Sequence, residues 1–160
     1  MENSSYQPIA WVGEGVGVRI LDQTRLPAEE VYLETDDYRE IAAAIRELKI
    51  RGAPAIGIAG AYAVALGALK TEAGGDFQKK LLGIIKTIAV TRPTARNLFR
   101  ALERLQKIAE SGKNPAQIRQ ALVAEAVSIH KEEADATRHL SLYGAELIKD
   151  GWTILTHCNT

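Results

Sequence analysis

The spacing of apolar residues divides the chain into a short extended part and a longer helical part. Between residues 6 and 35, apolar residues alternate with small or charged ones, as in Val16, Val18 and Ile20. A period of two and β-branched side chains predict half-buried strands. We therefore expect a small antiparallel sheet of about three strands at the beginning of the chain.

From residue 36 onward, apolar residues recur every three or four positions, which predicts amphipathic helices. Asp36 or Asp37 is expected to cap the first helix, and an alanine-rich helix should run from Pro54 to about Lys70. The later helices are expected to begin at or just after three further signals: Asp76, Pro93 and Asn114. The last helix should continue to about Lys149.

The alanine-rich helix lies in an uncharged stretch, Gly52 to Leu69, whose 18 residues match the lower limit of a membrane span. Alanine and glycine dominate it, however. A helix that is apolar and small on every side is typical of one buried among other helices. The favoured interpretation is a core helix.

The sequence pattern changes from helical to extended at the end of the chain. Asp150 and Gly151 should stop the last helix, and residues 152–156 predict a buried strand of a parallel α/β sheet, which needs further strands. The expected fold is therefore mainly α with a small N-terminal antiparallel sheet (α+β). Residues 1–35 and 36–150 should form one domain of sheet and helical bundle. Residues 151–160 should begin a second domain, which makes the chain the front part of a longer protein.

Composition excludes several classes of function. Twenty basic and 20 acidic residues give a net charge of zero, which disfavours a nucleic-acid or membrane partner. One cysteine permits no disulfide framework, and the polar N-terminus has no signal core, so a cytoplasmic setting is expected. His130 and His139 share no helix face and are expected to be solvated. We find no metal-ligand cluster and no nucleotide-binding glycine loop, so no cofactor is predicted.

The junction at residues 49–57 is the most informative one. Gly52 suits a helix C-cap and Pro54 the first position of the next helix. The free amides and positive dipole end of that helix would then lie beside Arg51. We hypothesise that a phosphate binds at Arg51, Gly52 and Ala53. The alternative is a tight helix–helix turn with a solvated arginine.

Two further positions could carry chemistry. Arg92 stands directly before a proline that is expected to start a helix, and Thr94 could add a hydroxyl; the alternative is a loop arginine paired with a carboxylate. Cys158 follows the predicted strand, where ligand sites of α/β sheets lie, but it could equally be a small buried hydrophobe. A dyad with His157 is disfavoured because neighbours on a strand face opposite sides.

Four stretches together resemble the methylthioribose-1-phosphate isomerase family, the aldose–ketose isomerases of methionine salvage. They are residues 20–27 (ILDQTRLP), 50–57 (IRGAPAIG), 91–95 (TRPTA) and 154–159 (ILTHCN). The first stretch favours the isomerases over two related groups. These are the ribose-1,5-bisphosphate isomerases and the regulatory subunits of translation initiation factor 2B, which remain the alternative functions.

The resemblance implies a sheet-plus-helix domain followed by a Rossmann-like domain. It assigns substrate phosphate to Arg51, Gly52, Ala53 and Arg92, and a catalytic role to Cys158. It also implies a sugar-phosphate substrate, no cofactor and a homodimer at full length. The family's catalytic aspartate, glutamine and asparagine-lysine pair have no counterpart in this chain, so the isolated chain is expected to be inactive.

Overall fold

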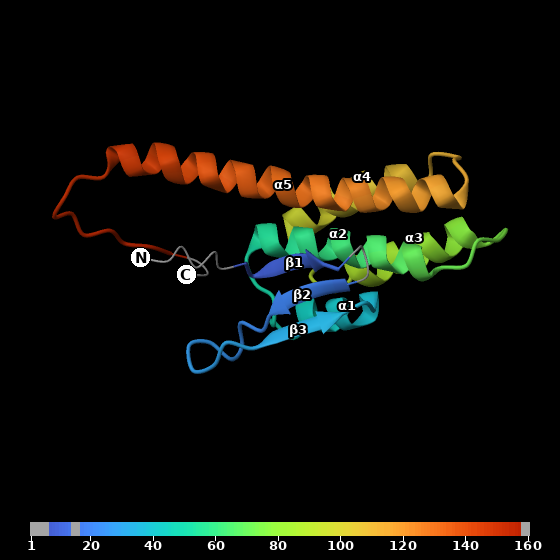
Figure 1. Cartoon of the computed structure of the whole chain (residues 1–160), viewed down its shortest axis with the longest axis horizontal. Helices are drawn as coiled ribbons and strands as arrows, with labels where there is room; N and C mark the ends of the chain where they lie inside the picture. Colours follow the sequence, from blue (N-terminus) through green and yellow to red (C-terminus); the bar gives the residue numbers. More distant parts are fainter. Residues whose placement is uncertain (1–6, 14–16, 158–160) are drawn as a thin grey trace.

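The structure is a computed structural model of the 160-residue chain, and it describes residues 7–13 and 17–157. Figure 1 shows a small sheet packed beside a set of helices, with one long helix extending beyond the rest. The predicted class, mainly helical with a small antiparallel sheet, is confirmed.

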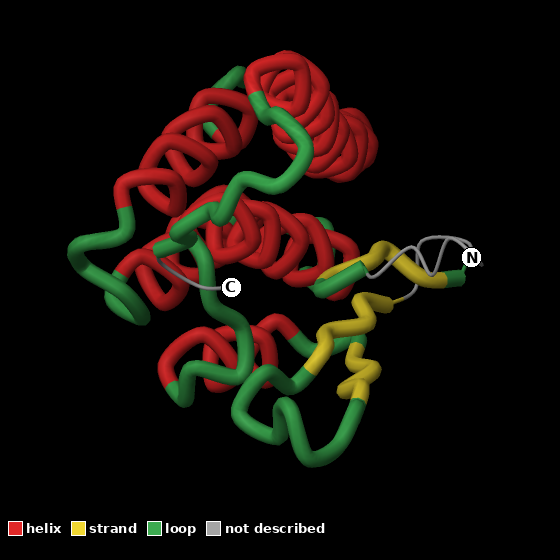
Figure 2. The backbone as a smooth tube through the Cα atoms, turned by 90° about the vertical axis from the view of Figure 1, so that its left-hand side faces the viewer, coloured by secondary structure: helices red, strands yellow, loops and turns green. Residues whose placement is uncertain are grey.

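The sheet consists of three antiparallel strands in sequence order: β1 (Ile9–Val12), β2 (Gly17–Leu21) and β3 (Tyr32–Thr35). Ile20 in the central strand pairs with Ile9 on one side and Leu33 on the other. Alternation places Val18 and Ile20 in the core, as predicted. Val16, the other residue of that pattern, lies outside the described residues. Figure 2 shows the strands lying along one side of the helices.

The described helices follow the sheet in this order: α1 (Tyr38–Arg46), α2 (Ala53–Lys70), α3 (Phe77–Ala89), α4 (Arg96–Ala109) and α5 (Pro115–Leu147). The side chain of Asp37 accepts a hydrogen bond from the Arg39 amide and caps α1. Asn114 and Gln117 form a reciprocal capping box at the start of α5.

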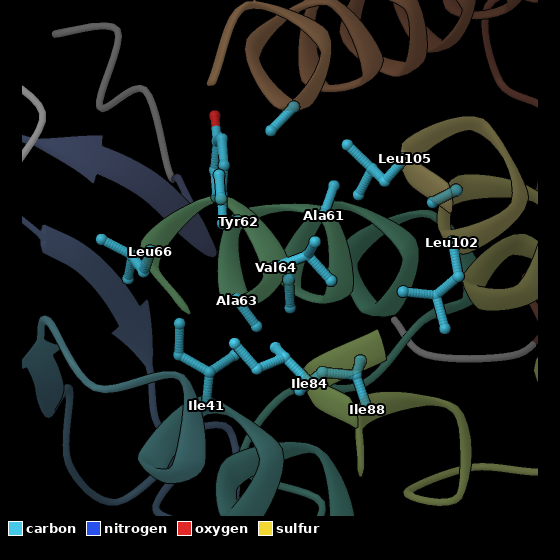
Figure 3. Close-up of a cluster of buried hydrophobic side chains, with 14 of the residues drawn as sticks. Ile41, Ala61, Tyr62, Ala63, Val64, Leu66, Ile84, Ile88, Leu102 and Leu105 are labelled. Carbon is cyan, nitrogen blue, oxygen red and sulfur yellow. The ribbon is translucent and has the colours of Figure 1, made fainter. Parts of the chain in front are cut away.

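Helix α2 forms the centre of the core, and α1, α3, α4 and α5 all pack against it. Every residue from Ile56 to Ala68 is buried. Its length and composition also fit a membrane span, but 72% of that stretch is buried inside the protein, as the core-helix interpretation expects. Figure 3 shows Ile41, Ile84 and Leu102, from three other helices, surrounding α2.

Two predicted helix boundaries were wrong. Helix α1 ends at Arg46, and the left-handed residue after it is Leu48 (φ 62°) rather than Gly52. Gly52 does have a positive φ of 88°, but as the N-cap of α2. Pro93 lies in a turn, and α4 begins only at Arg96.

The predicted strand at residues 152–156 is also absent. These residues are exposed and have no regular secondary structure. A strand exists only through hydrogen bonds to a neighbouring strand, and none of the described residues pairs with this segment. The apolar sequence is therefore compatible with a strand but does not form one here.

Candidate phosphate-binding site

An open pocket of about 750 Å³ lies where the end of α1, the start of α2 and the α3–α4 loop meet. Side chains from four separate parts of the sequence line it: Leu48, Arg51, Gly52, Ala53, Ile56, Arg92, Thr94, Ala95, Thr156 and His157. The structure thus brings together all four residues that the sequence analysis assigned to a phosphate.

The start of α2 supplies unpaired backbone donors. The first α-helical hydrogen bond of this helix runs from the Ile56 amide to the Gly52 carbonyl at 3.0 Å. No side chain of residues 7–13 or 17–157 caps this end, and its first turn contains no acidic residue. Amides at a helix N-terminus that lack such a cap favour an anion.

Arg92 lies in the turn that leads from α3 into α4. Its carbonyl accepts a hydrogen bond from the Ala95 amide at 3.0 Å, and the neighbouring Thr91 hydroxyl donates to the Ile88 carbonyl at 2.6 Å. The Nη1 atom of Arg92 is buried and has no hydrogen-bond partner in the described part of the chain. A buried donor without a partner is costly, so an acceptor that reaches this atom would stabilise the site.

Neither pocket arginine forms an ion pair with any residue that the structure describes. Arg51 is exposed and Arg92 is half-buried. The alternative in which Arg92 pairs with a carboxylate is therefore not realised within residues 7–13 and 17–157. No carboxylate appears among the described lining residues, so the two guanidinium groups meet no acidic side chain there.

Thr156 and His157 reach the pocket although they are far from it in sequence. Cys158, the predicted catalytic residue, comes next but lies outside the described residues. Its role stays a prediction. His157 is exposed, and within the described part of the chain there is no group of three or more potential metal ligands.

Sequence reasoning missed a close approach between helices α2 and α4, next to the segments that line the pocket. A Cβ atom at Gly57 would lie 3.0 Å from the Asn97 carbonyl oxygen and 3.2 Å from its carbon. The lack of a side chain at Gly57 therefore lets the first turns of α2 and α4 touch. The glycine content of this helix was the available signal, but it does not reveal which helix comes close.

His130 was expected to be solvated, and this prediction was wrong. It is half-buried, and its Nδ1 lies 2.6 Å from the Tyr62 hydroxyl. Burial lowers the pKa of His130 and raises the pKa of Tyr62 to about 12. Trp11 packs against the same tyrosine, with ring centroids 4.9 Å apart. The pair joins α2 to α5 and lies outside the phosphate pocket.

Comparison with known proteins identifies a family and several relatives of this chain. The model of the initiation factor 2 subunit family matches residues 49–160. The chain belongs to this family. It is 53% identical to the methylthioribose-1-phosphate isomerase of Dehalococcoides mccartyi (strain ATCC BAA-2266 / KCTC 15142 / 195) over 142 residues, which cover 88% of this chain and 42% of that protein.

Other members of the family show the same relation. The methylthioribose-1-phosphate isomerase of Geotalea daltonii is 46% identical over 97% of this chain and 45% of its own length. The crystal structure of 5-methylthioribose 1-phosphate isomerase from Pyrococcus horikoshii matches with a TM-score of 0.85 at 32% identity, covering 91% of this chain and 41% of that one.

A structure with a different name is almost as similar. Translation initiation factor eIF-2B, subunit delta, from A. fulgidus matches with a TM-score of 0.81 at 35% identity, covering 91% of this chain and 42% of that one. The chain spans less than half the length of these relatives. The fold alone therefore does not separate an isomerase from an initiation factor subunit.

Proposed function

We propose that this chain supplies the phosphate-binding part of an aldose–ketose isomerase that converts 5-methylthioribose 1-phosphate into 5-methylthioribulose 1-phosphate. The observation that carries the proposal is the convergence of Arg51 and Arg92 on the uncapped start of α2. We infer the substrate from relatives at 46–53% identity, which are named methylthioribose-1-phosphate isomerases.

The chemistry matches the pocket. Phosphate at C1 locks the sugar ring, so the ring must open before a hydrogen moves from C2 to C1. Arg51, Arg92 and the α2 amides would hold the phosphate, and binding energy from that remote group orients the reacting carbons. Cys158 would act next to C1 and C2 as a base or an electrostatic stabiliser.

Ring opening calls for a general acid. No carboxylate lies among the described residues that line the pocket. We therefore expect the 160-residue chain to bind sugar phosphates without turning them over. We also propose a cytoplasmic protein that forms a homodimer at full length and has no nucleic-acid or membrane partner.

Binding is tested first on the chain itself. Titration with inorganic phosphate, followed by NMR chemical shifts, should perturb the amides of Gly52 and Ala53. Arg51→Ala and Arg92→Ala should each weaken binding about tenfold or more, because each removes charge-assisted hydrogen bonds. Arg138→Ala, which removes the same charge from an exposed part of α5, should bind as the parent does. Equal losses of phosphate affinity in all three variants would show that phosphate responds only to the net charge of the protein and would contradict a specific site.

Turnover is tested in a fusion of this chain with the remaining part of the Dehalococcoides mccartyi relative. The fusion should isomerise 5-methylthioribose 1-phosphate, and Cys158→Ala should abolish turnover while phosphate binding remains. A Cys158→Ala fusion that keeps full activity would remove this residue from the mechanism.

A binding or regulatory subunit is the second candidate function, and the match to the initiation factor 2B subunit favours it. It predicts sugar-phosphate binding without turnover even in a well-folded fusion. An isomerase for ribose 1,5-bisphosphate is the third candidate, and turnover of that sugar in preference to the methylthio sugar would identify it.

A further inference from the structure

The residue that follows the first helix has an unusual backbone conformation. Leu48 has a φ of 62°, and no other residue of the described chain except glycines has a positive φ. Its amide donates to the Ile45 carbonyl at 3.4 Å, and the Lys49 amide donates to the Ala44 carbonyl at 2.9 Å. These two bonds define a Schellman motif, whose left-handed position is normally occupied by glycine.

Leucine is a poor choice for this position on backbone grounds. The left-handed region brings Cβ close to the following carbonyl oxygen, which glycine avoids. Burial in the core does not compensate, because the Leu48 side chain is 46% exposed. The exposed Leu48 side chain thus presents an apolar surface on the open side, where a ligand can contact it.

That open side is the phosphate pocket. Leu48 lines it together with Arg51, Arg92 and Ile56, so the pocket combines two cations with an apolar wall. A ligand that fits this arrangement carries a phosphate and, away from it, an apolar group. Inorganic phosphate alone would leave the exposed Leu48 side chain facing water.

We propose that Leu48 is a specificity-determining residue that contacts the apolar 5-methylthio group of the sugar phosphate. The inference rests on the proposed function, since it places the ligand in the same pocket. Leu48 favours the methylthio sugar over one with a 5-hydroxyl group, because a hydroxyl against the leucine loses its hydrogen bonds to water.

The test compares three ligands on the 160-residue chain: inorganic phosphate, ribose 1-phosphate and 5-methylthioribose 1-phosphate. Two variants separate the side chain from the backbone. Leu48→Gly removes the side chain and relieves the left-handed backbone, while Leu48→Asn keeps a side chain that tolerates this conformation but is polar. Leu69→Asn is the matched control, an exposed leucine at the other end of α2 that lines none of the described pockets.

In the parent and in Leu69→Asn, the methylthio sugar should bind more tightly than ribose 1-phosphate. Both Leu48 variants should reduce this preference about tenfold and leave the affinity for inorganic phosphate unchanged. The thermal midpoint of Leu48→Gly should not fall below that of the parent, which excludes unfolding as the cause.

Each contrary result has a distinct meaning. An unchanged preference in both Leu48 variants, with phosphate still bound, overturns the role of Leu48 and leaves the proposed function intact. A preference lost in Leu69→Asn as well shows a general effect of the substitution and also overturns it. If none of the three ligands binds the parent, the proposed function fails and the role of Leu48 fails with it.

Discussion

At the scale of single residues, the hydrogen bond between Tyr62 and His130 joins two helices of the core. Tyr62 belongs to the core helix α2, and His130 lies on α5, so the bond spans 68 positions of sequence. The lowered pKa of His130 keeps its imidazole neutral near pH 7, so its Nδ1 and the tyrosine hydroxyl share a hydrogen bond between two neutral groups.

Removing the hydroxyl should destabilise the fold. Tyr62→Phe leaves the ring packing against Trp11 in place but deprives the half-buried His130 nitrogen of its partner. We expect the free energy of unfolding to fall by about 1–2 kcal/mol, measured by urea denaturation. A His130→Phe, Tyr62→Phe double variant should recover part of this loss, and strictly additive losses would contradict coupling between the two residues.

The same histidine predicts a dependence of stability on pH. Because its pKa is lowered in the folded state, the unfolded chain binds the proton more tightly. The stability that the neutral His130 contributes is therefore fully present above the ordinary histidine pKa of 6.5. It is lost as the pH falls below that value. Denaturation at pH 7.5 and 5.5 should show this slope, and His130→Gln should flatten it. His139→Gln, at an exposed position of α5, should keep it.

Sequence reasoning could single out residues whose type alone indicates their chemistry, such as a positively charged side chain. Arg51 and Arg92 could be singled out because each stands beside an expected helix start, and the structure places both on one pocket; their binding of phosphate stays a prediction. Leu48 could not, since nothing about a leucine indicates a left-handed backbone or a place on a pocket wall. The setting of His130 was missed because its partner, Tyr62, is remote in sequence.

At the scale of helices, two glycines of α2 let this helix pack closely against α4. Gly57 allows contact with the Asn97 backbone at the pocket end of α2, and Gly60 lies against Leu98, where a Cβ would be only 2.3 Å from Cδ1. A leucine side chain can adjust, but a backbone carbonyl cannot move without its helix. We therefore expect Gly57 to help set the position of the Arg92 turn, which leads into α4, relative to the start of α2.

Gly57→Ala should consequently weaken phosphate binding. Its Cβ would push the start of α4, and with it the Arg92 turn, away from Arg51. We expect a several-fold loss of phosphate affinity and a lower unfolding midpoint, despite the better helix propensity of alanine. Gly83→Ala is the control. It lies in α3 with nothing within 4 Å of the new Cβ, so it should stabilise the chain by up to about 1 kcal/mol and bind phosphate normally.

The predicted elements were right where the signal is local and wrong where it depends on a neighbour. Periodicity and caps located each of the five helices in the described residues, and the Asn114 cap was right to the residue. The observed end of α1 and start of α4 differ by a few residues from the expected ones, because turns can include residues that also favour helices. Residues 152–156 have the composition of a strand, but strand formation needs a partner that composition cannot supply.

At the scale of the whole molecule, α5 has two unequal halves. Its buried residues, Ile118, Leu122, Ala126 and Ile129, all lie in the first half. The second half extends beyond the other helices (Figure 1) and exposes Leu140 and Leu147, each at 74%. Stability should therefore come almost entirely from the first half.

Two substitutions in the same helix test this division. Leu122→Ala removes a fully buried side chain and should cost about 2–5 kcal/mol. Leu140→Ala removes an exposed one and should change the free energy of unfolding by less than about 0.5 kcal/mol. Hydrogen exchange should agree, with amides after residue 136 exchanging well before those between 118 and 129. Similar costs for both leucines would show that the second half is packed in solution.

The Nη1 atom of Arg92, which has no hydrogen-bond partner among the described residues, has a practical consequence for the choice of buffer. A ligand that binds only the native state raises the melting temperature by mass action, so phosphate buffer should protect the chain where Tris at equal ionic strength does not. Phosphate at ten times its dissociation constant would add about 1.4 kcal/mol. A simple buffer screen is thus the quickest assay for occupancy of the pocket.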